Sequence, residues 1–321
     1  QAWAPTIFWL FVCRIFSGIT GASITTASAY IADISDDSNR SKNFGMIGAA
    51  FGLGFIIGPV IGGLLGQFGS RVPFYAAAVL CLVNFAYGYF ILPESLGKEH
   101  RRPFEWKRAN PVGSLLKVRT HPEILKLFIA WFLVYLASHA VQTNWAYFTM
   151  YKFAWDEKTV GISLGVMGAF TAFVQGFLIR KVHPKLGSER SILYGIMFYC
   201  TGMLLFAFAQ KEWMMYAILA IYCLGGIAGP ALQSVISSKV SPKEQGDLQG
   251  ALTSVISITS IIGPLLMTQI FYFFTHPDAK IKLLTLELKP PFQFSGAPFF
   301  LGFVLMAVSA YFVYYVFHRK K

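Results

Sequence analysis

Long apolar stretches alternate with short polar ones along the whole chain. Each apolar stretch is about 20 residues or longer, which at about 1.5 Å per helical residue matches the roughly 30 Å hydrocarbon core of a bilayer. The pattern predicts nine membrane spans: Pro5–Ala32, Phe44–Phe68, Pro73–Leu92, Ile124–Met150, Val160–Ile179, Ser191–Ala209, Trp213–Val235, Leu248–Phe274 and Ala297–Tyr315. We therefore expect an all-α polytopic membrane protein.

Composition agrees with a membrane protein, because 55% of the residues are hydrophobic and only 13% are charged. A water-soluble domain with so few charges could not cover its surface. The net charge of +12 suggests nucleic acid at first, but the Lys and Arg residues lie almost wholly between the apolar stretches. We therefore expect membrane lipids as partners, and no nucleic acid.

The basic residues also predict orientation. With alternate loops assigned to alternate sides, 19 of the 27 Lys and Arg residues fall on the side of the C-terminus and 7 on the other, leaving Arg14 alone inside a span. Cytoplasmic loops are the ones enriched in Lys and Arg. We therefore expect the C-terminus in the cytoplasm, Gln1 outside, and the plasma (inner) membrane as the location.

The longest segment between spans is also the most basic and contains four prolines. It predicts a cytoplasmic linker over 94–123, between the second part of an N-terminal bundle (1–93, three spans) and a six-helix C-terminal bundle (124–321). Transporters built from two equal halves have six spans on each side. We therefore expect three helices to be missing ahead of Gln1, so that these nine correspond to helices 4–12 of 12.

Internal similarity at a fixed period supports two repeated halves. Residues recur 205 positions apart, and the pairs are Gly21 with Gly226, Gly45 with Gly250, and Gly58-Pro59 with Gly263-Pro264.

The second span contains the stretch GLGFIIGPVIGG. Spacings of four place Gly54, Gly58 and Gly62 on one helical face, where another helix can approach closely, and Gly63 adds a further small residue. Pro59 removes a backbone donor and bends the helix. The pattern predicts a close-packed, kinked interface on which a rocking bundle could pivot.

Arg14 is charged and lies within the first span. A charge near the bilayer centre is costly, so we expect Arg14 to face the bundle interior and to meet an acidic or carbonyl partner. It either joins helices or takes part in proton coupling or gating.

All fifteen acidic residues lie in loops or at span ends. Proton-coupled transport needs a group that titrates within the membrane. The sequence leaves two sources, namely spans ahead of Gln1 and His139, which alone among the six histidines lies mid-span. The pKa of an ordinary histidine suits proton exchange. His139 could instead be a hydrogen-bonding residue lining the pore.

Polar residues within spans predict a mostly apolar cavity with a few polar anchors, which suits an amphiphilic organic solute. The candidates are His139, Gln142, Asn144, Gln175 and Gln233, with Tyr135, Tyr147, Tyr194 and Tyr199 as aromatic walls.

Several other classes of site are not expected. The four cysteines lie inside apolar stretches and form no C-x-x-C pair, so we expect no metal or cofactor. The phosphate-cradling G-x-x-x-x-G-K-[ST] motif of ATP-driven pumps is absent, and so is the H-E-x-x-H motif of a metalloenzyme. We therefore expect a transporter that is not an enzyme, and that is monomeric.

Several motifs carry a family resemblance. The spacing G-x-x-x-G-P-x-x-G-G resembles the antiporter signature on the fifth helix of major-facilitator drug/proton exchangers. Five further segments resemble the tetracycline efflux subgroup, namely RIFSGITGA, AYIADISDDSNRSKNFG, LPES, GGIAGPALQ and EQGDLQGAL. The similarity runs from about Phe11 to Pro264. The resemblance implies the major-facilitator fold, whose halves are parallel repeats. It also implies that Arg14 faces an acid on preceding helices, that Arg40 lies in a cytoplasmic loop, and that Gln175 and Gln233 face the central cavity.

The departures concern the substrate. Where tetracycline exporters carry a functional aspartate in helix nine this chain has Tyr199, and a helix-eight histidine is replaced by Thr171. We expect proton-coupled efflux of an amphiphilic, tetracycline-like or multidrug compound by alternating access, with a small molecule and protons as partners. A nutrient importer or facilitator, a receptor, and a non-transporting truncated protein are the alternatives. We expect nine spans alone not to catalyse coupled exchange.

Overall fold

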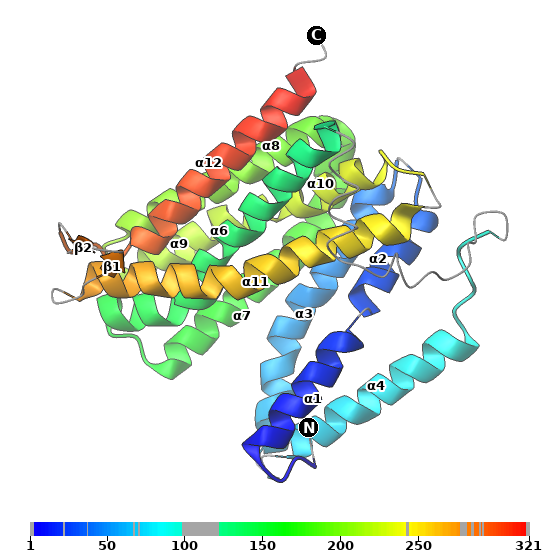
Figure 1. Cartoon of the computed structure of the whole chain (residues 1–321), viewed down its shortest axis with the longest axis horizontal. Helices are drawn as coiled ribbons and strands as arrows, with labels where there is room; N and C mark the ends of the chain where they lie inside the picture. Colours follow the sequence, from blue (N-terminus) through cyan, green and yellow to red (C-terminus); the bar gives the residue numbers. More distant parts are fainter. Residues whose placement is uncertain are drawn as a thin grey trace.

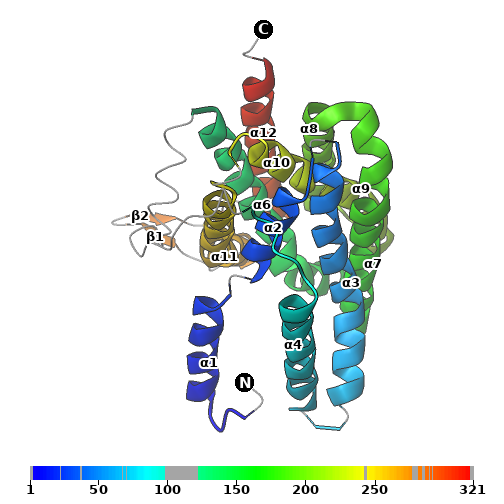
Figure 2. The same ribbon diagram turned by 90° about the vertical axis from the view of Figure 1, so that its right-hand side faces the viewer.

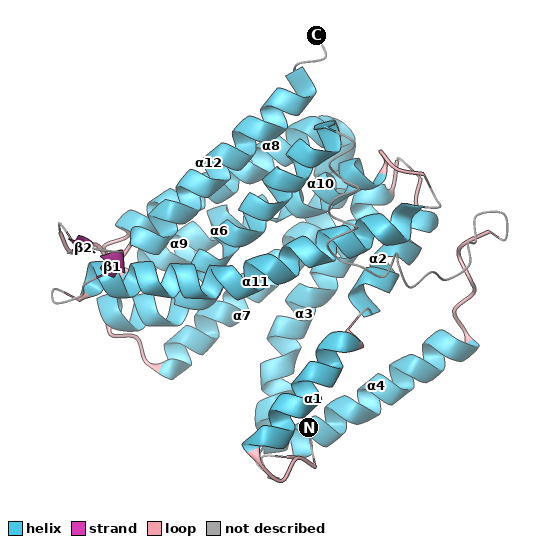
Figure 3. Cartoon of the chain, in the orientation of Figure 1, coloured by secondary structure: helices cyan, strands magenta, loops and turns pink. Residues whose placement is uncertain are grey.

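The computed structural model describes residues 3–318 apart from 22, 37, 67, 70, 98–121, 242–243, 277–280, 284–285, 289 and 291. Long helices make up nearly all of it (Figure 1, Figure 3). In the first half they are α1 (Ile7–Ile19), α2 (Ser23–Asp33), α3 (Arg40–Gly66) and α4 (Val72–Phe90). The second half contains α6 (Pro122–Phe153), α7 (Glu157–Phe173), η3 (Val174–Leu178), α8 (Ile179–Phe208), α9 (Glu212–Leu224), η4 (Gly225–Ile227), α10 (Ala228–Ser237), α11 (Gln245–Thr275) and α12 (Ala297–His318). Two short antiparallel strands, β1 (Ile281–Leu283) and β2 (Leu286–Leu288), lie between α11 and α12.

The prediction of an all-α membrane protein is confirmed. Among the described residues, seven stretches are long and apolar enough to cross a membrane: Ile7–Asp33, Val72–Phe90, Ile124–Phe153, Lys158–Phe208, Glu212–Ser237, Gln245–Thr275 and Ala297–His318. The 27-residue helix α3, some of whose side chains lie outside the described residues, is a further long helix. Each of the nine predicted spans falls on one of these seven stretches or on α3.

The loop expected between Ile179 and Ser191 is nearly absent. Helix continues through Pro184, and the only residue with non-helical φ and ψ inside α8 is Gly187, at φ 75° and ψ 172°. The left-handed region costs a residue with a Cβ atom but not glycine. The chain therefore turns from one span to the next at a single residue, which is why the 51-residue apolar stretch contains two predicted spans.

The internal repeat is visible in the positions of the breaks. Gly21 lies in the interruption between α1 and α2, and its equivalent Gly226 lies in the 3-10 turn η4 that separates α9 from α10. The next helices of the two halves, α3 and α11, begin at Arg40 and Gln245, which are again 205 positions apart. Corresponding spans are thus broken and restarted at corresponding residues.

The hydrophobic core lies in the second half, where α6, α8, α9, α10, α11 and α12 pack together. Its largest fully buried side chains include Trp131, Trp145, Phe206 and Phe299. In contrast, neither α1 nor α4 has a buried residue among those described. These two helices present apolar side chains on all sides.

The two halves meet at one end of the molecule, where α2 and α10 finish and α3 and α11 begin. We call this the basic end, since Arg40 and Lys239 lie there. There α2 packs on α11, and α3 packs on α7, η3 and α10. The hydroxyl of Thr25 donates to that of Thr253 across the contact, at 3.0 Å. Toward the opposite end α1 and α4 stand away from the second half (Figure 2).

Candidate functional site

Two irregular helical segments meet the first half at the contact between the halves. The π-helix η3 contacts both α3 and the 3-10 turn η4. Gln175 of η3 is half-buried, and its side chain fills the place that a side chain on Gly48 of α3 would occupy. A methyl group added at Gly226 would lie 3.3 Å from Nε2 of the same glutamine. Irregular turns inside helices are frequent at functional sites.

The neighbouring residues of α9 and η4 contact both Tyr199 of α8 and Thr171 of α7, the two positions expected to depart from the tetracycline exporters. The ring of Tyr199 packs against Gly225, where an added methyl would come within 2.6 Å of Cδ1, and its centroid lies 4.9 Å from that of Tyr222. The hydroxyl of Thr171 donates to the carbonyl of Met167 at 2.8 Å and lies 3.9 Å from Sγ of Cys223. Thr171, Tyr199 and Gln175 therefore surround one stretch, Tyr222–Gly226.

His139 lies elsewhere, at the contact between α6 and α11. It is 7% exposed, and its ring covers the backbone of Gly263, where an added methyl would come within 2.8 Å of the histidine Cβ. No described residue forms a hydrogen bond with its ring nitrogens. His139 is thus packed against the second Gly-Pro pair of the repeat.

The other predicted cavity residues occupy three different environments. Asn144 is 0% exposed, and neither amide atom has a partner among the described residues. Gln142 is exposed and donates to the hydroxyl of Ser138 at 3.1 Å. Gln233 donates to the carbonyl oxygen of Gln249 at 2.8 Å, so its amide joins α10 to α11. The structure brings Gln175 and Tyr199 to one place but does not gather all five candidates there.

The pair Gln233 and Gln249 belongs to a polar ladder at the basic end that the sequence reasoning missed. One helical turn further on, the hydroxyl of Ser237 donates to Gln245 at 2.9 Å, and the Gln245 amide returns a bond to the Ser237 carbonyl at 2.8 Å. A pattern in the sequence could have predicted this ladder. The two glutamines of EQGDLQGAL are four residues apart, and so are Gln233 and Ser237.

The glycine face of α3 differs from the expectation. Methyl groups added at Gly54, Gly58 or Gly62 would have no neighbour within 4 Å among the described residues. The close approach of another helix occurs earlier, where a methyl on Gly52 would lie 2.8 Å from the Ala172 backbone nitrogen. The difference arises because Gly52 and Gly54 lie about 200° apart around the helix, so another face of α3 meets the second half. Gly63 and Pro59 lie on the same helix, but their side-chain surroundings are outside the described residues.

Arg14 is exposed on α1, and no described residue forms an ion pair or hydrogen bond with it. Its expected partner stays a prediction. The linker residues 98–121, most of the predicted 94–123, lie outside the described residues. The part of LPES that is described does make a contact, because the hydroxyl of Ser95 donates to Asp33 at 2.9 Å.

Asp36 organises the turn that precedes α3. Its carboxylate accepts hydrogen bonds from the Ser38 hydroxyl at 2.6 Å and from the backbone N–H groups of Ser38 and Asn39, each at 3.0 Å. The hydrogen bond from the Ser38 side chain contributes most to holding the pKa of Asp36 below its ordinary value. The two backbone hydrogen bonds and the charge of Arg40 lower this pKa further. The turn therefore depends on a charged carboxylate.

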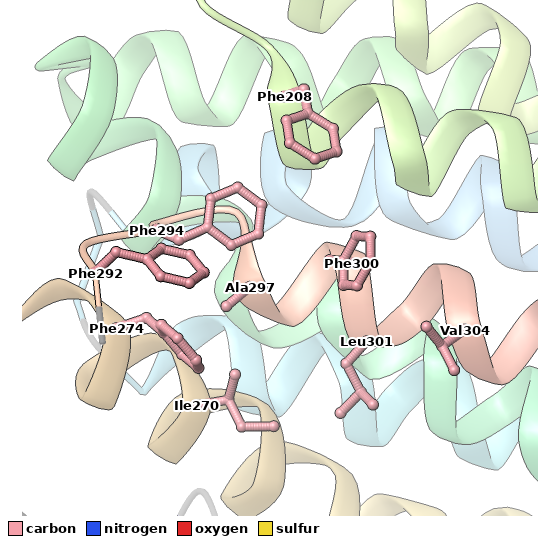
Figure 4. Close-up of a pocket in the computed structure, with 9 residues that line it drawn as sticks. All are labelled: Phe208, Ile270, Phe274, Phe292, Phe294, Ala297, Phe300, Leu301 and Val304. Carbon is pink, nitrogen blue, oxygen red and sulfur yellow. The ribbon is translucent and has the colours of Figure 1, made fainter. Parts of the chain in front are cut away.

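An apolar pocket of about 560 Å³ lies at the end opposite the basic one (Figure 4). None of its lining residues was a predicted site residue, and all are apolar: Phe208, Ile270, Phe274, Phe292, Phe294, Ala297, Phe300, Leu301 and Val304. No motif in the sequence predicts this pocket, because its phenylalanines come from three separate segments of the chain.

Comparisons with known proteins agree with this architecture. Residues 2–264 match the family model described as Major Facilitator Superfamily. The chain is 38% identical over 271 residues to "Tetracycline resistance protein, class C" of Escherichia coli, covering 84% of this chain and 68% of that protein. It is 36% identical to the class G protein of Vibrio anguillarum, covering 84% and 69%.

Solved structures show the same fold. The crystal structure of the human organic anion transporter MFSD10 (TETRAN) superposes with a TM-score of 0.82 at 20% identity, covering 97% of this chain and 72% of that one. The transporter FucP, in the outward conformation, gives 0.65 at 13% identity, covering 91% and 72%. With its family model matched over most of its length and its relatives more than one third identical, this chain belongs to the major facilitator superfamily.

Proposed function

We propose that this protein is a secondary active transporter that exports an amphiphilic, drug-like compound in exchange for protons, by alternating access between its two halves. The observation that carries the proposal is the 38% identity to a tetracycline resistance protein, which extends over 84% of the chain. Export confers resistance to a drug that acts inside the cell. The protein acts as a monomer in the plasma (inner) membrane, with its C-terminus in the cytoplasm, and is not an enzyme.

The arrangement of the halves supports alternating access. They touch at the basic end, the predicted cytoplasmic side, and are apart at the other, as expected for an outward-facing state. In this state the surroundings of Tyr222–Gly226, with Thr171, Tyr199 and Gln175, lie near the closed end. These residues form the proposed floor of the substrate site.

Arg14 and His139 are the proposed coupling or gating residues. His139 is packed at the contact of α6 with α11, so a change in its charge would alter the packing of two long helices. Such a link between a titratable group and helix packing is what proton-driven gating requires.

Inside-out membrane vesicles containing the protein expressed from its whole reading frame provide the test. Tetracycline is the first probe, and an amphiphilic dye cation is the second. We expect uptake that appears when a proton gradient is imposed and collapses when nigericin removes the gradient. Uptake that persists unchanged without a gradient would instead support a facilitator. If neither probe is taken up, the proposal that the protein exports drugs is contradicted.

The same vesicles test the floor of the site. Tyr199→Ala removes the ring that covers Gly225 and should change the ratio of tetracycline to dye transport. Gln210→Ala, an exposed amide in the turn between α8 and α9, is the control and should leave that ratio unchanged. Equal effects of the two substitutions would place the substrate elsewhere.

A further inference from the structure

We propose that the side chain of Gln175 is the wedge that holds the two halves together at the basic end and sets how readily they part there. The inference rests on the proposed transport function, because it assigns a gating residue to that function. It goes beyond the place of Gln175 in the proposed floor of the substrate site, because the same side chain also reaches the backbone of Gly48 on the other half.

The first observation is the fit of this side chain. Gln175 extends from η3 into a space between two glycines, Gly48 on α3 and Gly226 in η4. Any side chain at Gly48 would collide with the Gln175 amide, and Nε2 would lie 3.0 Å from its first carbon. The glutamine thus takes the place of the side chain that α3 lacks, a knob in a glycine hole.

The second observation is where the wedge lies along α3. Beside it, toward the basic end, a methyl on Gly45 would lie 3.0 Å from the Gln175 carbonyl and 3.1 Å from the Ile179 side chain. In the other direction, a methyl on Gly52 would lie 2.8 Å from the Ala172 backbone nitrogen and 3.0 Å from the Gly168 carbonyl oxygen, whereas methyls at Gly54 and Gly165 would meet no described residue within 4 Å. Gln175 therefore lies within the zone in which α3 contacts the second half, which includes Gly45, Gly48 and Gly52.

The third observation is the chemistry of the amide. No described residue forms a hydrogen bond with the Gln175 side chain, although it is half-buried between the halves. An amide without a protein partner loses solvation when it is inserted and regains it when the halves part. The wedge thus combines favourable packing with an unfavourable polar group, and this balance keeps the contact reversible.

This balance makes two substitutions act in opposite directions. Gln175→Ala removes the packing and should favour parting of the halves. Gln175→Leu keeps most of the volume and removes an amide that loses part of its solvation in the contact, so it should favour the closed contact. A residue that merely supports folding of α7 would not show this reversal of sign.

The experiment measures closure directly, without substrate. A methyl added at Gly176 would lie 3.3 Å from Cβ of Ala49, so Ala49→Cys with Gly176→Cys places two thiols within reach of a disulfide in this state. The rate at which the linked peptide forms under mild oxidant is followed by mass spectrometry on the full chain in lipid nanodiscs. The single-cysteine variants control for the four native thiols.

We expect the Gln175→Ala background to slow linkage about fivefold, the effect of a modest change in one contact. Gln175→Leu should link at least as fast as the parent and should transport more slowly. Linkage of Gln175→Ala at the parental rate, or equal slowing by both variants, would overturn the inference. Failure of the parent pair to link would also overturn it. A protein that links as expected but moves no drug would contradict only the proposed transport function.

Discussion

The imidazole ring of His139 lies directly on the backbone of Gly263, the glycine of the second Gly-Pro pair. The first pair, Gly58-Pro59, occupies the equivalent position of the other half, where an added methyl would meet no atom within 4 Å. A side chain at Gly263 would therefore collide with its neighbour, whereas a side chain at the equivalent Gly58 would collide with no described residue.

This asymmetry gives a matched pair of substitutions. Gly263→Ala should lower the free energy of unfolding by about 1–3 kcal/mol, because the new methyl must displace the ring of a 7%-exposed histidine. Gly58→Ala should change it by less than about 0.5 kcal/mol. Denaturant unfolding in detergent measures both, and similar losses from both would show that the His139 contact is not responsible.

Removing the ring should relieve the strain. In a Gly263→Ala background, His139→Ala should be far less damaging than in the parent, with an interaction energy of about 0.5–3 kcal/mol in a double-mutant cycle. Additive effects would mean that the two residues do not share the contact. The same His139→Ala variant should also show weakened dependence of transport on the proton gradient if the residue couples proton movement to gating.

The polar ladder between α10 and α11 should contribute to stability. Gln249→Ala leaves the Gln233 amide without its partner and should cost about 1–3 kcal/mol, because Gln249 is 1% exposed. Gln142→Ala removes an exposed amide of the same chemistry and should cost less than about 0.5 kcal/mol. Thermal unfolding of the two variants side by side measures the difference, and equal midpoints would contradict the assignment.

The turn before α3 should weaken in acid. The pKa of Asp36 is lowered in the folded protein, so the carboxylate stabilises the fold at pH values above the ordinary aspartate pKa. That contribution is lost as the pH falls through the lowered folded value. Asp36→Ala should therefore be less stable than the parent at neutral pH, and the two should converge once the pH falls below the lowered pKa, as judged by thermal unfolding. A difference that persists in acid would exclude the charged carboxylate as its cause.

Much of the fold was predictable because its causes are local. The length of an apolar stretch is set by the bilayer, so the spans followed from hydropathy. The repeat followed from glycines that mark equivalent breaks, such as Gly21 and Gly226. The boundary between Ile179 and Ser191 was less well predicted, since helix continues through the polar segment 180–190 and one glycine with positive φ, Gly187, turns the chain.

The site was less predictable because it depends on how the two halves meet. Periodicity places Gly54, Gly58 and Gly62 on one face but cannot say which face of α3 meets the second half. Likewise Asn144 and Gln142 are both polar and two residues apart, yet one is fully buried and the other exposed. The polarity of a residue in the sequence does not show whether its side chain points toward another helix or toward the outside of the bundle.

The π-turn at Val174–Leu178 has a consequence for evolution of the gene. One extra residue in a turn offsets the helix that follows by about 100°, so a straight helical wheel drawn from Thr171 misplaces every position after it. A single-codon deletion in this segment would restore a regular wheel and re-aim residues 179–186, including Ile179, which packs on Gly45. Hydropathy would hardly change. Selection should therefore remove insertions and deletions in this segment, although it tolerates many substitutions there.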